Sequence, residues 1–141
     1  MDKNLDLRSS KTNKMIKEAF FELMDTIGFE NISVVNLTKK ALISRTTFYL
    51  HYKDKYDLLE QIENEILDGF KNIANNLCID DIVKKGLNNK NTFLLLVKIY
   101  EYVKENQQFF KLIMCNNENP SFYYRLSDAI KVARSEERRV G

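Results

Sequence analysis

The segment from Arg45 to Tyr52 holds a planar guanidinium, two aliphatic hydroxyls, two phenols and an imidazole within eight residues. If this segment is helical, Arg45, Thr46, Tyr49 and Leu50 share one broad face, because side chains four residues apart lie above one another on a helix. Phe48 and Tyr52 lie on another face, and we assign them to the core. The guanidinium fork of Arg45 matches O6 and N7 of guanine, and a good bidentate contact contributes about 1–3 kcal/mol of discrimination between bases. The pattern predicts that Arg45, Thr46 and Leu50 contact base edges in a DNA groove.

The surrounding residues carry donors suited to phosphate oxygens, and such contacts fix the register on DNA without reading its sequence. Lys55 is predicted to lie in the first turn of a further helix, where free backbone N–H groups and the helix dipole already favour an anion. The predicted phosphate contacts come from hydroxyl, amide, imidazole and ammonium groups: Ser33, Asn36, Thr47, Tyr49, His51 and Lys55.

These predictions have plainer alternatives. His51 is the single histidine of the chain, and such a residue is more often a surface residue than a ligand. A partly buried packing role explains Tyr49 about as well as phosphate contact does. Arg45 and Lys55 could be solvated charges, but the motif around them favours DNA contact.

Short helices must hold these side chains in place. An apolar stripe with three-and-four spacing runs from Met15 to Ile27, which predicts a first helix that begins near Ser9 or Ser10 and is stopped by Gly28. Next in the chain, Ser33 can cap a second helix and Ser44 a third, with only residues 42–44 between them. Two short helices separated by about three residues form a helix-turn-helix, and Asp54 then caps a long fourth helix.

Charge is segregated along the chain, although the formal net charge is only +2. Between residues 39 and 55, five basic residues stand against one acidic residue, a balance of +4. Between residues 56 and 86, seven acidic residues stand against three basic ones, a balance of −4. A small basic surface beside an acidic helix suits a protein that touches phosphates with one limited region. A solvated helix face explains Lys39 and Lys40 equally well.

The rest of the chain continues in helical patterns. Only four Gly and one Pro interrupt it, and no β-branched alternation is sustained, so the predicted fold is all-α. Residues 92–107 are apolar on nearly every side, which requires that other elements surround them.

Several classes of protein are disfavoured. The sequence has no paired carboxylates with a base, no Ser/His/Asp set, no glycine-rich phosphate loop and no CxxC spacing. We therefore expect no catalytic residue, no metal, no cofactor and no enzyme activity. No apolar run reaches the roughly 18 residues of a membrane helix, so we expect a soluble, cytoplasmic protein without membrane contact.

The order of these features resembles the DNA-binding head of the TetR/AcrR family of transcriptional regulators. The likeness covers residues 11–59, and its densest part is Thr47-Phe48-Tyr49 followed by the stretch from Lys55 to Leu59. The remainder is similar to a subgroup from Gram-positive bacteria that includes dihydroxyacetone kinase regulators. The chain departs from the family at Leu42 and Thr46, where glycine is common. Leu42 therefore requires either a turn without positive φ or some strain.

The resemblance implies a three-helix head over residues 1–54 and a helical ligand-binding and dimerisation body over residues 55–133. It also implies a homodimer that binds a double-stranded DNA operator and responds to a small-molecule effector, acting more often as a repressor. An alternative is an adaptor that activates through a protein partner such as a kinase-like subunit. A pocket in the body could be lined by Phe93, Leu96, Tyr100, Phe110, Met114 and Tyr123, together with Tyr102, Phe109 and Phe122. For any single one of these residues, ordinary core packing is the strongly favoured explanation.

The last eight residues, 134–141, have the sequence that translated sequencing-adapter DNA would encode. We therefore expect a non-native tail there, and a body that is incomplete at its C-terminus.

Overall fold

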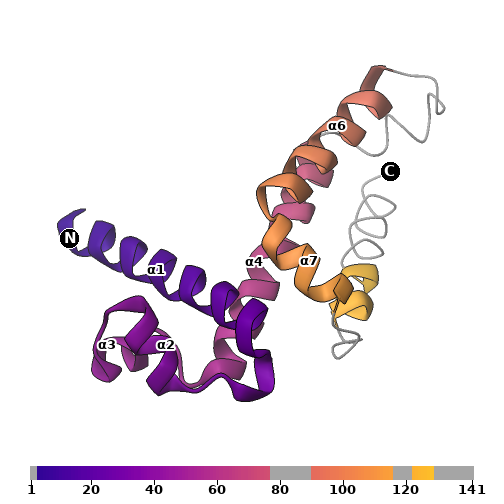
Figure 1. The fold of residues 1–141 in the computed structure, drawn as a ribbon. Helices are drawn as coiled ribbons and strands as arrows, with labels where there is room; N and C mark the ends of the chain where they lie inside the picture. The colour runs from indigo at the N-terminus through magenta and orange to yellow at the C-terminus, as the bar shows by residue number, and fades with distance from the viewer. Residues whose placement is uncertain (1–2, 77–89, 116–121, 129–141) are drawn as a thin grey trace. The chain divides into compact units, whose positions relative to one another are not determined.

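The computed structural model describes residues 3–76, 90–115 and 122–128, and the regular elements within these ranges are helices (Figure 1). This confirms the predicted all-α fold. The chain divides into two compact units, Met1–Gln61 and Ile62–Gly141, here called the head and the body. None of the described helices is both long and apolar enough to cross a membrane. The predicted tail over residues 134–141 lies outside the described residues.

Helix α1 (Lys3–Ile27) is longer than predicted, because it begins at least six residues before Ser9. The prediction of a start at Ser9 or Ser10 was wrong: both serines lie inside the helix. The predicted end of α1 is confirmed: Gly28 follows the helix with a positive φ of 78° and donates its N–H to the carbonyl of Leu23 at 3.2 Å. A residue without Cβ adopts this φ without steric cost.

The head continues through a 3-10 turn, η1 (Phe29–Asn31), to α2 (Val34–Ala41) and α3 (Arg45–His51). Its core contains side chains from α1, α2, α3 and the first turns of α4 (Lys55–Asn76). Burial of one large apolar side chain contributes about 1.5–3 kcal/mol, so a core of this size can hold short helices in place. The buried apolar residues of the head are Ile16, Ala19, Phe20, Ile32, Leu37, Ala41, Phe48, Tyr52 and Leu58.

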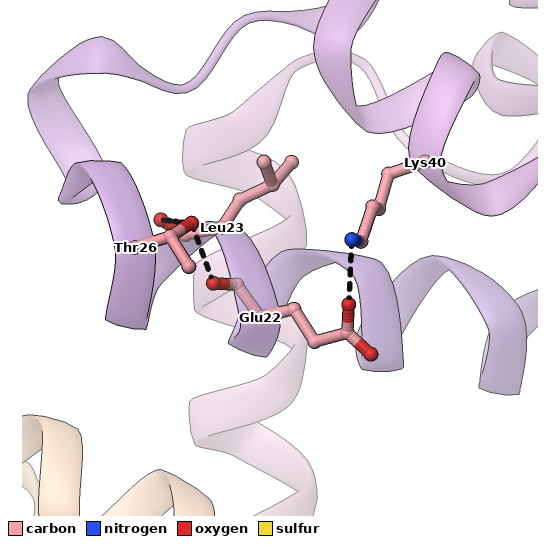
Figure 2. Close-up of polar contacts among 4 residues, drawn as sticks. All are labelled: Glu22, Leu23, Thr26 and Lys40. Atoms are coloured by element: carbon pink, nitrogen blue, oxygen red, sulfur yellow. Dashed lines mark hydrogen bonds and ion pairs between the residues drawn. The ribbon is translucent and has the colours of Figure 1, made fainter.

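A polar contact on the surface also joins α2 to α1 (Figure 2). The ammonium of Lys40 lies 2.9 Å from the carboxylate of Glu22, and both side chains are at least half exposed. One turn later, the hydroxyl of Thr26 donates to the carbonyl of Glu22 at 2.9 Å. Exposed ion pairs contribute about 0–1 kcal/mol, so this pair orients α2 more than it stabilises it.

The body contains the later part of α4, α6 (Lys90–Glu105), α7 (Gln107–Cys115) and helical residues 122–128. Its described buried apolar residues are Ile62, Ile66, Leu67, Phe109 and Phe122. The rings of Phe109 and Phe122 meet edge to face at 5.1 Å, and those of Phe70 and Phe110 do so at 5.9 Å.

Tyr102 ties α6 to α4. Its hydroxyl donates to the carbonyl of Ile66 at 2.9 Å, and a Cβ at Gly69 would collide with its ring. Burial, together with Glu65, Asp68 and Glu105, raises the pKa of Tyr102, so the phenol keeps the proton that it donates.

The body also holds a buried carboxylate. Glu63 is only 3% exposed, and Arg125 donates to it at 2.6 Å and to the side-chain oxygen of Asn64. A carboxylate buried this deeply needs a paired cation to offset its desolvation.

Candidate nucleic-acid interface

Capping side chains fix the start of α2. The Ser33 hydroxyl accepts from the N–H of Asn36 at 3.2 Å, and the Asn36 side-chain oxygen accepts from the N–H of Ser33 at 2.7 Å. The Asn36 amide also donates to the carbonyl of Asn31 at 3.2 Å. This capping box satisfies N–H groups that a helix leaves free at its start, and it confirms Ser33 as the N-cap.

The turn between α2 and α3 contains the three residues predicted, Leu42, Ile43 and Ser44. Ser44 caps α3 as expected: its hydroxyl accepts from the N–H of Thr47 at 3.1 Å and lies 2.9 Å from the Thr47 hydroxyl. Leu42 adopts the left-handed conformation, with φ 58° and ψ 43°, and its side chain is 85% exposed. The sequence predicted either a turn without positive φ at Leu42 or some strain there, and the structure has the strained, positive φ.

Two faces of α3 separate as the spacing predicts. Phe48 and Tyr52 are buried, which confirms them as core residues. The opposite side exposes Arg45, Thr46, Tyr49 and Leu50, and these four residues are here called the reading face. Leu50 is 79% exposed, so its apolar side chain does not stabilise the free protein through burial.

A contact with α1 holds the C-terminal end of α3. Tyr52 is the C-cap of α3, and its hydroxyl donates to the side-chain oxygen of Asn13 at 3.2 Å. Its ring packs against that of Phe48 at 5.7 Å. The reading face is therefore carried on a short helix whose back and whose end are both attached to the rest of the head.

The residues predicted to contact phosphates lie in different environments. Ser33 and Tyr49 are exposed, whereas Asn36, Thr47 and His51 are half-buried. The Asn36 side chain is already used at both its oxygen and its nitrogen by the capping contacts. The Ser33 hydroxyl accepts a hydrogen bond at its N-cap and can still donate one outward. The Thr47 hydroxyl shares a hydrogen bond with that of Ser44, and it can donate outward only when Ser44 supplies the proton of that bond.

Lys55 has partners that the sequence did not indicate. Its ammonium donates to the carbonyl of Phe29 at 2.9 Å and to that of Glu30 at 3.3 Å, and it lies 4.6 Å from the centre of the Phe29 ring. Lys55 therefore ties the first turn of α4 to η1. No sequence signal could have revealed this contact, because the partners lie 25 and 26 residues away.

Asp54 and Asp57 cap the start of α4. Asp54 accepts from the N–H of Asp57 at 2.8 Å, which confirms it as the predicted cap. Asp57 accepts from the N–H of Lys53 at 2.9 Å, and this backbone hydrogen bond, followed by one from the Gln61 amide, lowers the pKa of the Asp57 carboxyl.

The six predicted pocket residues of the body are largely at the surface. Phe93, Leu96 and Tyr100 follow one face of α6 and are 60–70% exposed, and Met114 and Tyr123 are also exposed. Phe110 is half-buried against Phe70. The ligand pocket therefore stays a prediction. Across residues 3–76, 90–115 and 122–128, no group of His, Cys, Asp or Glu is arranged to hold a metal ion.

Comparison with known families matches residues 16–62 to the family described as bacterial regulatory proteins, tetR family. The matched residues include α2, the turn, α3 and the first turns of α4, so they contain the whole reading face.

Curated relatives extend the similarity beyond the head. The HTH-type dhaKLM operon transcriptional activator DhaS of Lactococcus lactis is 31% identical over 117 residues, which cover 83% of this chain and 56% of DhaS. The HTH-type transcriptional regulator SAB2452 of Staphylococcus aureus is 30% identical over 118 residues, covering 80% of this chain and 59% of that protein. The chain thus spans less than two thirds of the length of both relatives.

A solved structure named dihydroxyacetone kinase operon activator DhaS has a TM-score of 0.49 and 26% identity, with 89% of this chain and 67% of that chain covered.

Proposed function

We propose, from the membership of this chain in the tetR family of bacterial regulatory proteins, that it is a transcriptional regulator that binds double-stranded DNA through α3. One observation carries the proposal. A helix of seven residues turns Arg45, Thr46, Tyr49 and Leu50 to solvent while Phe48 and Tyr52 anchor it in the core. An α-helix fits the major groove, and side chains near its N-terminus reach the base edges.

In this proposal Arg45, Thr46 and Leu50 contact bases, and Ser33, Asn36, Thr47, Tyr49, His51 and Lys55 contact phosphates. Arg45 binds guanine through its fork, and Leu50 packs against a thymine methyl group. The regulator acts as a cytoplasmic homodimer, because two reading helices about 34–36 Å apart meet successive major grooves on one side of the duplex. A small molecule bound in the body weakens DNA binding by favouring a different spacing.

The test begins with selection of bound sequences from random duplex DNA, using the full chain. Arg45→Ala then removes preference at one base position and costs about 1–3 kcal/mol of discrimination, because the bidentate contact is lost. Lys98→Ala, which removes an exposed charge on α6, serves as the matched control and leaves the preference unchanged. An Arg45→Ala variant that folds normally and selects the same sequence as the unaltered chain would contradict the assignment.

Regulation by repression is the first candidate, and activation through a protein partner is the second. The second is supported by DhaS, a relative that is itself named an operon activator. A reporter fused to the selected operator separates the two. Expression that rises on deletion of the regulator indicates repression, and expression that falls indicates activation.

A further inference from the structure

The side chain of Tyr52 carries a hydroxyl into the core of the head. It is only 3% exposed, and its ring packs against that of Phe48 at 5.7 Å. A phenylalanine would fill the same space without taking a hydroxyl out of water. The hydrogen bond that the hydroxyl donates to the side-chain oxygen of Asn13, at 3.2 Å, offsets this desolvation. Burial alone therefore does not account for a tyrosine at this position.

Asn13 lies on the side of α1 that faces the core. It precedes Ile16 by three residues and Phe20 by seven, so these side chains follow one face of the helix, and both apolar ones are fully buried. Asn13 itself is half-buried. Figure 1 shows the N-terminal half of α1 beside α3, and the bond to Tyr52 joins the two across 39 residues of sequence.

The contacts at the start of α3 are of a different kind. The Ser44 hydroxyl bonds to the N–H and the hydroxyl of Thr47, so these contacts define where α3 begins and not how it is tilted against α1. Phe48 anchors α3 through apolar packing, which has no preferred direction. A hydrogen bond weakens steeply away from its preferred distance and angle. The Tyr52–Asn13 bond therefore restrains the orientation of α3 in a way that packing does not.

The backbone transmits this restraint to the reading face. Tyr52 is the C-cap of α3, and its N–H donates to the carbonyl of Phe48 at 3.0 Å. The seven residues of α3 span about 10 Å, so a tilt of the helix shifts side chains at both of its ends. Groups that recognise a ligand must be held within about 0.5 Å of their productive positions. A small tilt of α3 is therefore enough to disturb base contacts along the whole reading face.

We propose that Tyr52 and Asn13 are positioning residues for DNA recognition, whose hydrogen bond holds α3 at the tilt in which its reading face matches the bases. This inference rests on the proposed function of α3, and neither residue touches DNA in it. Without the bond, α3 samples further orientations, and only the fraction in the matching one binds the operator tightly. Binding to a mixed-sequence duplex depends on phosphate contacts and changes little.

The test uses two substitutions that remove opposite halves of the bond. Tyr52→Phe deletes the hydroxyl and keeps the ring on Phe48, and Asn13→Ala deletes the acceptor. The matched control is Thr38→Val, which removes another buried hydroxyl from the head, one that donates to the carbonyl of Val34 within α2 at 2.8 Å. The affinity of each full chain is measured on the operator selected with the unaltered chain and on a mixed-sequence duplex, well below the temperature at which that variant unfolds.

Each single variant should lose about 2- to 10-fold in the ratio of operator affinity to mixed-sequence affinity, the range set by the net contribution of one hydrogen bond. The double variant Asn13→Ala/Tyr52→Phe should lose no more than the more affected single variant, because both substitutions break the same bond. Preference should relax at all base positions that α3 reads, whereas Arg45→Ala affects one. The slope of log affinity against log salt should not change, because no phosphate contact is removed.

Three results would overturn the inference. One is a Tyr52→Phe variant that unfolds at a lower temperature but keeps the affinity ratio of the unaltered chain, since the bond would then serve stability alone. Another is a Thr38→Val variant that loses as much of the ratio as Tyr52→Phe, which would assign the loss to a weakened core. The third is additive losses in the double variant. If Asn13→Ala does not fold, Tyr52→Phe and Thr38→Val decide the test.

Failure of the proposed function gives a separate result. An unaltered chain that binds neither duplex would refute the role of α3 itself. If Arg45→Ala changes base preference while Tyr52→Phe does not, the role of α3 survives and only the positioning role is refuted.

Discussion

Leu42 has a backbone conformation that its own side chain disfavours. The left-handed region costs a residue with a Cβ about 1–2 kcal/mol, whereas glycine enters it freely but loses more entropy on folding, about 0.5–1 kcal/mol. The side chain at position 42 is 85% exposed, so its removal leaves no cavity.

We therefore expect Leu42→Gly to raise the free energy of unfolding by about 0.5–1 kcal/mol, measured by urea denaturation of the full chain. Leu42→Ala is the matched control. Alanine removes the same exposed surface but keeps a Cβ, so it should give no gain. Equal stabilisation by both substitutions would mean that strain at this φ is not the cause.

Single residues also show what the sequence could not indicate. The roles of Phe48 and Tyr52 followed from helical spacing, because a pattern of apolar residues depends on local geometry alone. The contacts of Lys55 with Phe29 and Glu30 depend on how distant segments meet, and no local pattern encodes that. A Lys55→Ala variant would weaken the head as well as any phosphate contact, so it cannot isolate a role in DNA binding.

The helices of the head were predictable in kind and mostly in extent. Gly28, Ser33, Ser44 and Asp54 mark their boundaries because each residue supplies a conformation or an oxygen that a helix end requires. The start of α1 was not predictable from Ser9, since a serine that can cap a helix is also tolerated inside one when it faces solvent. The sequence likewise contained no sign that the ring of Tyr102 packs directly against Gly69, because the two residues are 33 positions apart in the chain.

The cap of α4 should depend on pH through Asp57. Its folded pKa lies below the ordinary value of 3.8, because the carboxylate accepts hydrogen bonds from Lys53 and Gln61. A lowered folded pKa contributes stability that is present above the unfolded pKa and is lost as pH falls through the folded value. Neutral pH therefore preserves this contribution, and strong acid removes it.

Asp57→Asn should accordingly melt at a lower temperature than the unaltered chain at neutral pH, and the difference should shrink toward zero as pH falls below about 3.8. Thermal unfolding followed across that range measures the difference. Glu60→Gln, one turn further along α4, controls for the loss of an exposed carboxylate. A gap that stays constant with pH would show that the charge on Asp57 has no part in the cap.

On the scale of the whole molecule, the net charge is small, but basic and acidic residues are segregated along the chain. The formal net charge is +2, from 22 basic and 20 acidic residues. The described basic groups concentrate on the head, at Arg8, Lys11 and Lys14 of α1 and from Lys39 to Lys55, while α4 carries acidic side chains such as Glu60 and Asp68. At 0.15 M ionic strength the Debye length is about 8 Å, so charges far from a phosphate are largely screened from it.

Binding to DNA should therefore follow local contacts and not net charge. The variant Glu60→Gln/Asp68→Asn/Glu101→Gln raises the net charge by three through exposed positions of α4 and α6. Its salt slope on DNA should equal that of the unaltered chain, because the slope counts the phosphates that are contacted. If this variant instead steepened the slope, the field of the whole molecule would govern binding.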